Sequence, residues 1–215
     1  MASIFTASQS RSQQQAEKDR AEAQQYLEEQ RAQAQQDAEE QRAQDQALQA
    51  YFEEMGNLLL DEDLRTSQED DEASNDEASP LARARTLTIL GRVDPERKRS
   101  VVFFLYEANL IQTEQPIVSL ASADLSHVDL SGTNYLNDIN LRYANLSGAD
   151  LSGNQLIDAN LIEANLREAE LSGADLSGAD LSNAYLNHAR SVTDEQLAQP
   201  HSLEGATMPD GSKHD

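Results

Sequence analysis

Between Leu120 and Leu186 the chain repeats almost the same five-residue unit fourteen times. A clear copy, ANLSG at residues 144–148, is followed directly by ADLSG at residues 149–153. On an α-helix, a step of five residues would turn each successive leucine by about 140°, so the leucines would scatter around the axis and form no apolar face. The period therefore argues against an α-helix in this region.

In an extended chain, the same unit forces a corner. Ala123 and Leu125 are two residues apart and share a face, whereas Leu125 and Val128 are three apart and would lie on opposite faces. Both pairs can point inward only if the chain turns between them. One corner in each unit closes a square coil after four units, and Ser-Gly pairs such as Ser147-Gly148 are typical of turns.

Two positions depart from the period. Leu130 and Leu141 are eleven residues apart instead of ten, so one residue is inserted near Tyr135-Leu136, which predicts a bulge at a corner. Asn154 occupies a position that is a small apolar residue in most other units. We expect a local distortion at Asn154 and no ligand site.

The repeated A(D/N)Lxx unit resembles the pentapeptide-repeat family over roughly residues 117–190. This resemblance implies a right-handed quadrilateral β-helix, here of about three and a half coils. The predicted fold class is a β-solenoid with an α-helical N-terminal region. Residues 191–215 form the expected C-terminal cap and tail, because Thr193 to Gln196 have a capping-box pattern and Pro200 ends the short helix that follows.

Residues 1–60 predict one long charged helix. No glycine or proline occurs up to Met55, fourteen glutamines lie between Gln9 and Gln49, and an eleven-residue repeat places a glutamate three residues before an arginine in each copy. These pairs are Glu17/Arg20, Glu28/Arg31 and Glu39/Arg42. Three alternatives stay open: a solvated single helix or stalk, a homomeric coiled coil along an alanine-rich stripe, and disorder.

The chain between this helix and the repeats divides into a linker and a helical pair. Apolar residues at helical spacing from Leu48 to Leu59 need a partner surface. Residues 61–80 are acidic and rich in serine, which is typical of a flexible linker. Residues 81–116 predict two short helices, 81–93 and 95–110, with Asp94 as the N-cap of the second. We expect them to pack together and cover the first coil, rather than to form a peptide-binding groove.

The leader at residues 81–111 also resembles the segment before the repeats in cyanobacterial pentapeptide-repeat proteins. In many of these proteins a transmembrane segment comes before the charged helix, but this sequence has no run of 18 or more apolar residues. We expect a cytoplasmic protein that does not insert into a membrane. The alternative is a soluble remnant of a membrane-anchored protein, membrane-peripheral if an upstream anchor is missing.

The sequence offers no catalytic motif. Cysteine is absent, and the four histidines lack the spacing typical of metal ligands. Phosphate-binding and nucleophile motifs are also missing. We therefore predict no enzymatic activity, no cofactor and no metal site.

Outward carboxylates are the candidate interaction surface. Residues one coil apart should stack, which places Asp129, Asp150, Glu170 and Arg190 in one column and Asn140, Asn160 and Asp180 in another. The family resemblance implies that such a column can mimic DNA and occupy a topoisomerase. A rod of three and a half coils is roughly 17 Å long, along which B-DNA presents about ten phosphates, whereas this column has three carboxylates.

The acidity of the chain is spread over its length. Residues 1–115 contain 24 acidic and 12 basic residues, and residues 116–215 contain 15 acidic and 4 basic residues, within a total charge of −23. This charge disfavours direct nucleic-acid binding.

The leading hypothesis is a non-enzymatic scaffold or protein-interaction module with an unknown protein partner, which could form a homo-oligomer through the N-terminal helix. The alternative is a DNA-mimic regulator of a type II topoisomerase (gyrase).

Overall fold

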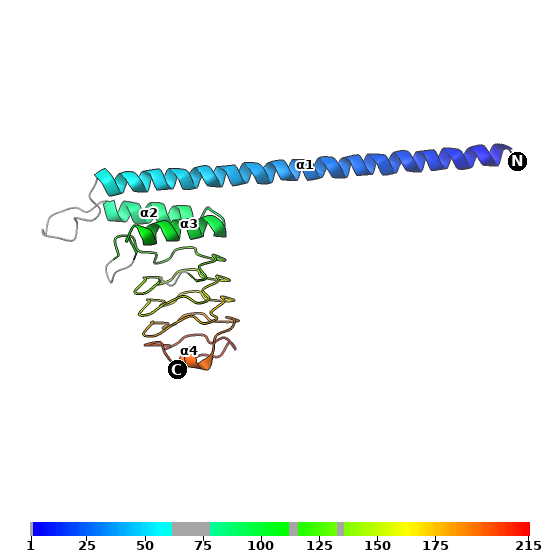
Figure 1. Cartoon of the computed structure of the whole chain (residues 1–215). Coiled ribbons are helices and arrows are strands. Elements are labelled where there is room, and N and C mark those ends of the chain that lie inside the picture. Colours follow the sequence, from blue (N-terminus) through cyan, green and yellow to red (C-terminus); the bar gives the residue numbers. More distant parts are fainter. Residues whose placement is uncertain (1, 62–77, 112–115, 133–135) are drawn as a thin grey trace. The chain divides into compact units, whose positions relative to one another are not determined.

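A computed structural model describes residues 2–61, 78–111, 116–132 and 136–215. Its helices are α1 (Ala2–Asp61), α2 (Ala78–Leu90), α3 (Pro95–Glu107) and α4 (Asp194–Leu197) (Figure 1). The chain forms two compact units, Met1–Gln46 and Ala47–Asp215. The last part of α1, residues 47–61, belongs to the second unit. Most of the expected 61–80 linker lies outside the described residues.

The first unit is the exposed part of α1. From residue 17 to residue 46 almost every side chain is exposed. Polar pairs four residues apart support the helix, such as Gln25 donating to Glu29 at 3.0 Å and Lys18 lying 3.7 Å from Glu22. Between two described side chains of α1, the ion pair shown is the Lys18–Glu22 pair at a spacing of four residues, and none is shown for the three Glu/Arg pairs at a spacing of three. Long exposed side chains gain little from pairing and stay hydrated.

The last turns of α1 bury the apolar residues that were expected to need a partner. Tyr51, Met55 and Leu58 are buried, and the ring of Phe52 lies 5.0 Å from that of Phe104 in α3. The Tyr51 hydroxyl shares a buried hydrogen bond of 2.9 Å with Thr86 Oγ1 of α2. Burial raises the pKa of Tyr51 to about 12, although the bond to Thr86 acts in the opposite direction. The predicted partner surface is therefore supplied by α2 and α3.

Helix α3 begins as the sequence predicts. Asp94 is the N-cap and accepts from the backbone N–H of Arg97 at 2.9 Å, and Pro95 stands at the first helical position. The helix ends at Glu107 rather than at Leu110. Asn109 has a φ of +57°, and this left-handed backbone ends the helix early.

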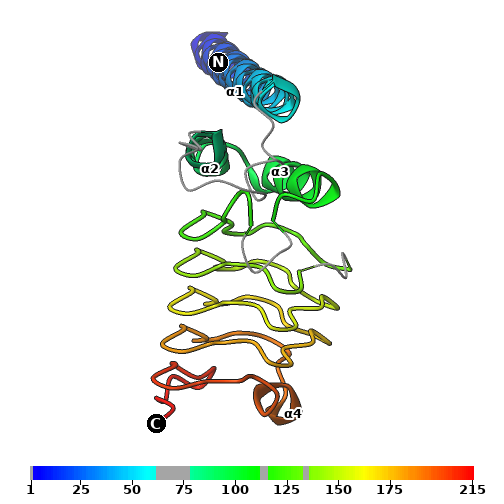
Figure 2. The same cartoon turned by 90° about the vertical axis from the view of Figure 1, so that its left-hand side faces the viewer.

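Helices α2 and α3 contact the first coil of the repeat region, which Figure 2 shows beneath them. Ser79 Oγ donates to the carbonyl of Ile117 at 2.6 Å, and Arg83 donates to the carbonyl of Ala121 at 2.9 Å. Val101, Val102 and Leu105 are buried on the inner side of α3. The two helices thus cover the apolar end of the coil and occupy hydrogen-bond acceptors at its edge.

The repeat region is a stack of coils joined by parallel bridges. The bridges fall into four columns, one for each side of the coil, and each joins residues 20 or 21 apart, except where the last coil ends at Ser202 and Thr207. The spacing is 21 for Asp129 and Asp150 but 20 for Asn140 and Asn160, so the inserted residue lies between Asp129 and Asn140, as predicted. Tyr135, one of the two candidates for the centre of that unit, lies outside the described residues, while Leu136 is buried.

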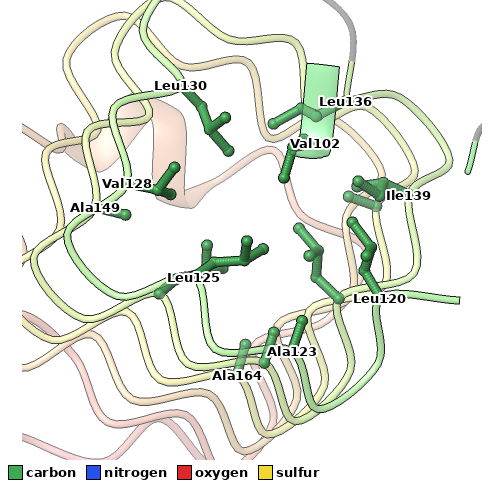
Figure 3. Close-up of a cluster of buried hydrophobic side chains, with 14 of the residues drawn as sticks. Val102, Leu120, Ala123, Leu125, Val128, Leu130, Leu136, Ile139, Ala149 and Ala164 are labelled. Carbon is green, nitrogen blue, oxygen red and sulfur yellow. The ribbon is translucent and has the colours of Figure 1, made fainter. Parts of the chain in front are cut away.

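Each side contributes a single paired residue, so no continuous strand forms among the described residues. The reason is the turn in every unit. A chain that turns after every five residues cannot pair several consecutive residues with the next coil. Leucines, alanines and other small apolar side chains point inward from all four sides and are buried (Figure 3). These apolar side chains therefore fill the interior of the coil.

The corners share one geometry whether or not they contain glycine. Ala123 N–H donates to the Leu120 carbonyl at 3.0 Å, and the third residue of the turn, Ser122, has a φ of +66°, as in a type II turn. Glu163 and Glu168 occupy the same left-handed region, at 56° and 59°. A residue with a Cβ costs about 1 kcal/mol there, which the ladder bonds between coils must offset.

Asn154 does not distort the coil. The flanking turn and the bridge from Gln155 to Asp175 are regular, so the expected distortion was wrong. The buried Asn154 side chain instead donates to the carbonyl of Leu130 in the preceding coil at 2.7 Å. A polar residue fits inside the coil because its amide has a partner there.

Helix α4 closes one side of the last coil. Thr193 and Gln196 form the predicted capping box. The Gln196 side chain also donates to the carbonyls of Leu171 and Ala174, both at 2.8 Å. Beyond α4, Thr207 pairs with Tyr185 of the coil and, antiparallel, with Lys213. The C-terminal segment thus rejoins the stack and covers its edge.

Candidate interaction site

The structure places the three predicted surface carboxylates in one column. Asp129 pairs with Asp150, Asp150 with Glu170, and Glu170 with Arg190, each through parallel backbone bridges. A neighbouring side of the coil carries Asn140, Asn160 and Asp180 in the same way. The backbone therefore holds these outward side chains in register.

The carboxylates of this column are already engaged. Asp129 accepts from the backbone N–H and hydroxyl of Ser131 at 2.9 and 2.6 Å, and from Arg99 of α3 at 2.9 Å. The Ser131 bonds, together with Arg99, hold the pKa of Asp129 below its ordinary value. Glu170 lies 3.9 Å from Arg190. Two of the three charges thus have a cation beside them.

The bonds to serine reveal a structural role for these aspartates. An acid followed two residues later by serine recurs around the coil, and its oxygen caps the turn that follows, as in Asp150/Ser152 and Asp180/Ser182. Asparagine does the same at Asn145/Ser147. The sequence therefore uses Asp and Asn interchangeably for the turn, and only the charge differs.

Asp124, Asn145 and Asn165 form a further column, whose side-chain hydrogen bonds make a polar ladder that reaches α3. Lys98 Nζ donates to Asp124 at 3.0 Å and to the Ser126 hydroxyl at 3.1 Å. Asp124 also accepts from Asn145 at 3.0 Å, and Asn145 accepts from Asn165 at 3.0 Å. Burial raises the pKa of Asp124, but Lys98 and Ser126 outweigh it, so the pKa lies below its ordinary value. Lys98 of α3 thus contacts the first coil, and the ladder continues from Asp124 to the next two coils.

An apolar cleft of about 340 Å³ lies between α3 and the first coil. Its lining comes from α3 and from two leucines of the coil: Arg99, Ser100, Val102, Phe103, Tyr106, Leu130 and Leu136. Figure 3 shows Val102, Leu130 and Leu136 converging at this corner of the coil. The sequence prediction favoured plain packing of α3 and did not identify the cleft.

One signal could have identified it. Residues 101–106 are six consecutive apolar residues, which cannot all lie on one face of a helix with 3.6 residues per turn. Val102 and Leu105 are buried, whereas Phe103 is 55% exposed. The surplus aromatic residue marks the rim of the cleft.

The described residues contain no group of three or more His, Cys, Asp or Glu side chains that could hold a metal ion. None of their helices combines the length and the apolar character needed to cross a membrane.

Comparison with known proteins defines the class of the repeat region. Residues 119–153, 135–173 and 155–190 match the family model of pentapeptide repeats, with eight copies. Together with the stacked coils, this match implies a β-helix solenoid, and helices lie on its N-terminal side. Over residues 119–190 the chain belongs to the pentapeptide-repeat family.

Three solved structures of pentapeptide-repeat proteins are similar to the chain. HetL, involved in heterocyst differentiation regulation in the cyanobacterium Nostoc sp. strain PCC 7120, is 33% identical over 49% of this chain and 46% of its own, with a TM-score of 0.22. Rfr23 from the cyanobacterium Cyanothece 51142 is 32% identical over 47% of this chain and 66% of its own, with a TM-score of 0.22.

The third structure is a protein of the Arabidopsis thaliana thylakoid lumen. It is 26% identical over 45% of this chain and 63% of its own, with a TM-score of 0.21. The chain thus spans between about half and two thirds of the length of these proteins. A comparison with curated proteins gives no match.

Proposed function

We propose that the chain is a non-enzymatic scaffold whose right-handed, four-sided coil presents side chains to a protein partner. The proposed contact surface is the column of Asp129, Asp150 and Glu170. The observation that carries the proposal is that two kinds of contact hold each of these residues in place. One carboxylate oxygen of each accepts from the backbone N–H two residues later, and the backbone of each is bridged to the adjacent coil. Side chains fixed in this way lose little conformational entropy on binding.

Amide variants of the column test the proposal without disturbing the turns. The triple variant Asp129→Asn, Asp150→Asn and Glu170→Gln keeps an acceptor at each turn, because asparagine already fills the same role at Asn145. Protein partners captured by crosslinking from the source cells should be lost with this variant.

A matched variant on other sides of the coil supplies the control. Asp138→Asn, Asp175→Asn and Asp180→Asn change the net charge by the same amount and should retain the partners. Equal capture by wild type and both variants would refute the column as the contact surface.

The DNA-mimic regulator of gyrase is the second candidate. The cations beside Asp129 and Glu170 weigh against it, because they reduce the charge that the column presents. A gyrase supercoiling assay with the purified protein decides the question. Inhibition at micromolar protein that disappears with Asp150→Lys and Glu170→Lys would favour the mimic over the scaffold.

Association through α1 and the cellular location also belong to the proposal. We place the protein in the cytoplasm, or at a membrane surface if an upstream anchor exists. Light scattering of the full chain at two concentrations separates a single exposed α1 from a homo-oligomer, because only the oligomer gains mass with concentration. Fractionation of the source cells tests the location.

A further inference from the structure

The cleft beside α3 has an apolar wall and an aromatic rim. Val102, Leu130 and Leu136 are buried behind it, Tyr106 is half-buried, and Phe103 is largely exposed. Its volume of about 340 Å³ falls in the range of pockets that bind ligands or side chains, about 300–1,000 Å³. An exposed phenylalanine at such a cleft offers apolar area that a partner could bury.

Two unpaired carboxylates flank this rim along α3. Glu96, Ser100, Phe103 and Glu107 lie at steps of four, three and four residues, so they share one helical face, and all four are exposed. Neither glutamate forms an ion pair within the described part of the chain. Arg99, the cation at the cleft, is directed to Asp129 and its charge is compensated there.

We propose that this cleft receives an apolar side chain from a partner protein segment that carries lysine or arginine on both sides of it. The helical rise puts Glu96 about 10 Å and Glu107 about 6 Å along α3 from Phe103, and these spacings define where the partner's cations would lie. The inference rests on the proposed role as an interaction module and specifies the chemistry of the partner. A chain with a net charge of −23 would also attract a basic partner at long range.

A second copy of the chain fits this face less well. Two α3 helices meeting through Phe103 would bring Glu96 and Glu107 of one copy toward the same residues of the other. Like charges facing each other oppose association. The charge pattern therefore favours a basic partner over self-association.

The test uses the full chain and a synthetic helical peptide with one leucine between two groups of lysines, labelled for fluorescence anisotropy. Phe103→Ser removes the rim, and Ser100→Phe fills the cleft from an exposed position. Each should weaken binding at least about tenfold, the effect of losing roughly one buried apolar contact. Leu81→Ser is the matched control, because Leu81 is an exposed apolar residue of α2. This variant should bind as wild type does.

Charge variants test the second half of the inference. Glu96→Gln with Glu107→Gln should weaken binding and flatten its salt dependence, whereas Glu163→Gln with Glu168→Gln, an equal charge change on the coil, should not. A peptide with asparagine in place of leucine should bind at least about tenfold more weakly. Replacing its lysines by glutamates should abolish binding.

Three results would overturn the inference. First, Phe103→Ser and Ser100→Phe could bind the peptide as well as Leu81→Ser does. Second, the peptide with glutamates could bind as well as the peptide with lysines. Third, light scattering could show a dimer that Phe103→Ser dissociates. All three experiments leave the residues of the carboxylate column unchanged. Failure here is therefore distinguishable from failure of the proposed function, which the column variants test separately.

Discussion

Replacing Lys98 by methionine should weaken the attachment of α3 to the first coil. Methionine keeps the length and apolar stem of lysine but loses the donors to Asp124 and Ser126. A hydrogen bond to a charged group contributes about 1.5–3 kcal/mol net. The Asp124 side chain is 42% exposed, so water replaces part of what the carboxylate loses. We expect a loss near the lower end, about 1.5–2 kcal/mol.

The reciprocal change should cost more. Asp124→Ala leaves the Lys98 ammonium, whose side chain is only 6% exposed, without its carboxylate. Breaking a buried pair in this direction costs up to about 3–5 kcal/mol, because the remaining charge cannot be hydrated. The asymmetry follows from the different burial of the two partners. Urea unfolding of the full chain at neutral pH, followed by circular dichroism, measures both losses.

Arg99→Met is the matched control on the same helix. The Arg99 and Asp129 side chains are 44% and 57% exposed, so their ion pair should be worth about 0.2–1 kcal/mol. The prediction is an order: Asp124→Ala should cost most, Lys98→Met less and Arg99→Met least. Equal losses for all three would show that burial does not decide the strength of these contacts.

The pH dependence gives a second check. Asp124 has a pKa in the folded protein below its ordinary value of 3.8, so its stabilising contribution is present above that value and is lost as the pH falls through the folded pKa. The stability difference between wild type and Lys98→Met should therefore be constant from neutral pH to about pH 5 and shrink below about pH 4. A difference that persists unchanged in acid would refute the ion-pair explanation.

Three further predictions concern single buried or strained positions. Asn154→Ala should lower the free energy of unfolding by about 1–3 kcal/mol, measured in urea, because the buried donor to the preceding coil is lost. Gly148→Ala should cost about 1 kcal/mol more than Gly153→Ala, because both have φ near +65° but only the Cβ at 148 would meet the His127 ring, at 2.5 Å. Thermal unfolding compares the two, and equal midpoints would contradict the contact. Tyr51→Phe should cost about 0.5–1.5 kcal/mol in urea. In an absorbance titration one tyrosine of wild type should ionise near pH 12, and this step should be missing from the variant.

The sequence was sufficient for features that depend on the period. Leucine and alanine two residues apart predict the inward positions, and the eleven-residue interval before Leu141 locates the insertion. The columns of outward residues follow by counting along the same period. The capping box at Thr193 and Gln196 is local enough to predict directly.

Features that depend on neighbouring elements could not be predicted in the same way. Asp129 and Asp175 have the same bonds to a following serine, yet only Asp129 also pairs with an arginine of α3. Nothing in the period specifies which aspartate α3 will contact. Likewise, the distortion expected at Asn154 is replaced by a hydrogen bond, because the residue finds its partner 24 positions earlier in the chain.

Recognition by a periodic solenoid has to come from residues that differ from one coil to the next. The Asp-x-Ser and Asn-x-Ser units are nearly the same on each coil and satisfy their own turns, so alone they cannot distinguish one partner from another. The surplus Phe103 and its flanking glutamates occur once, and Arg190 ends the acidic column once. Substitutions at these unique positions should therefore alter partner choice more than equal charge changes at repeated aspartates outside the column of Asp129, Asp150 and Glu170, which alter mainly the overall charge.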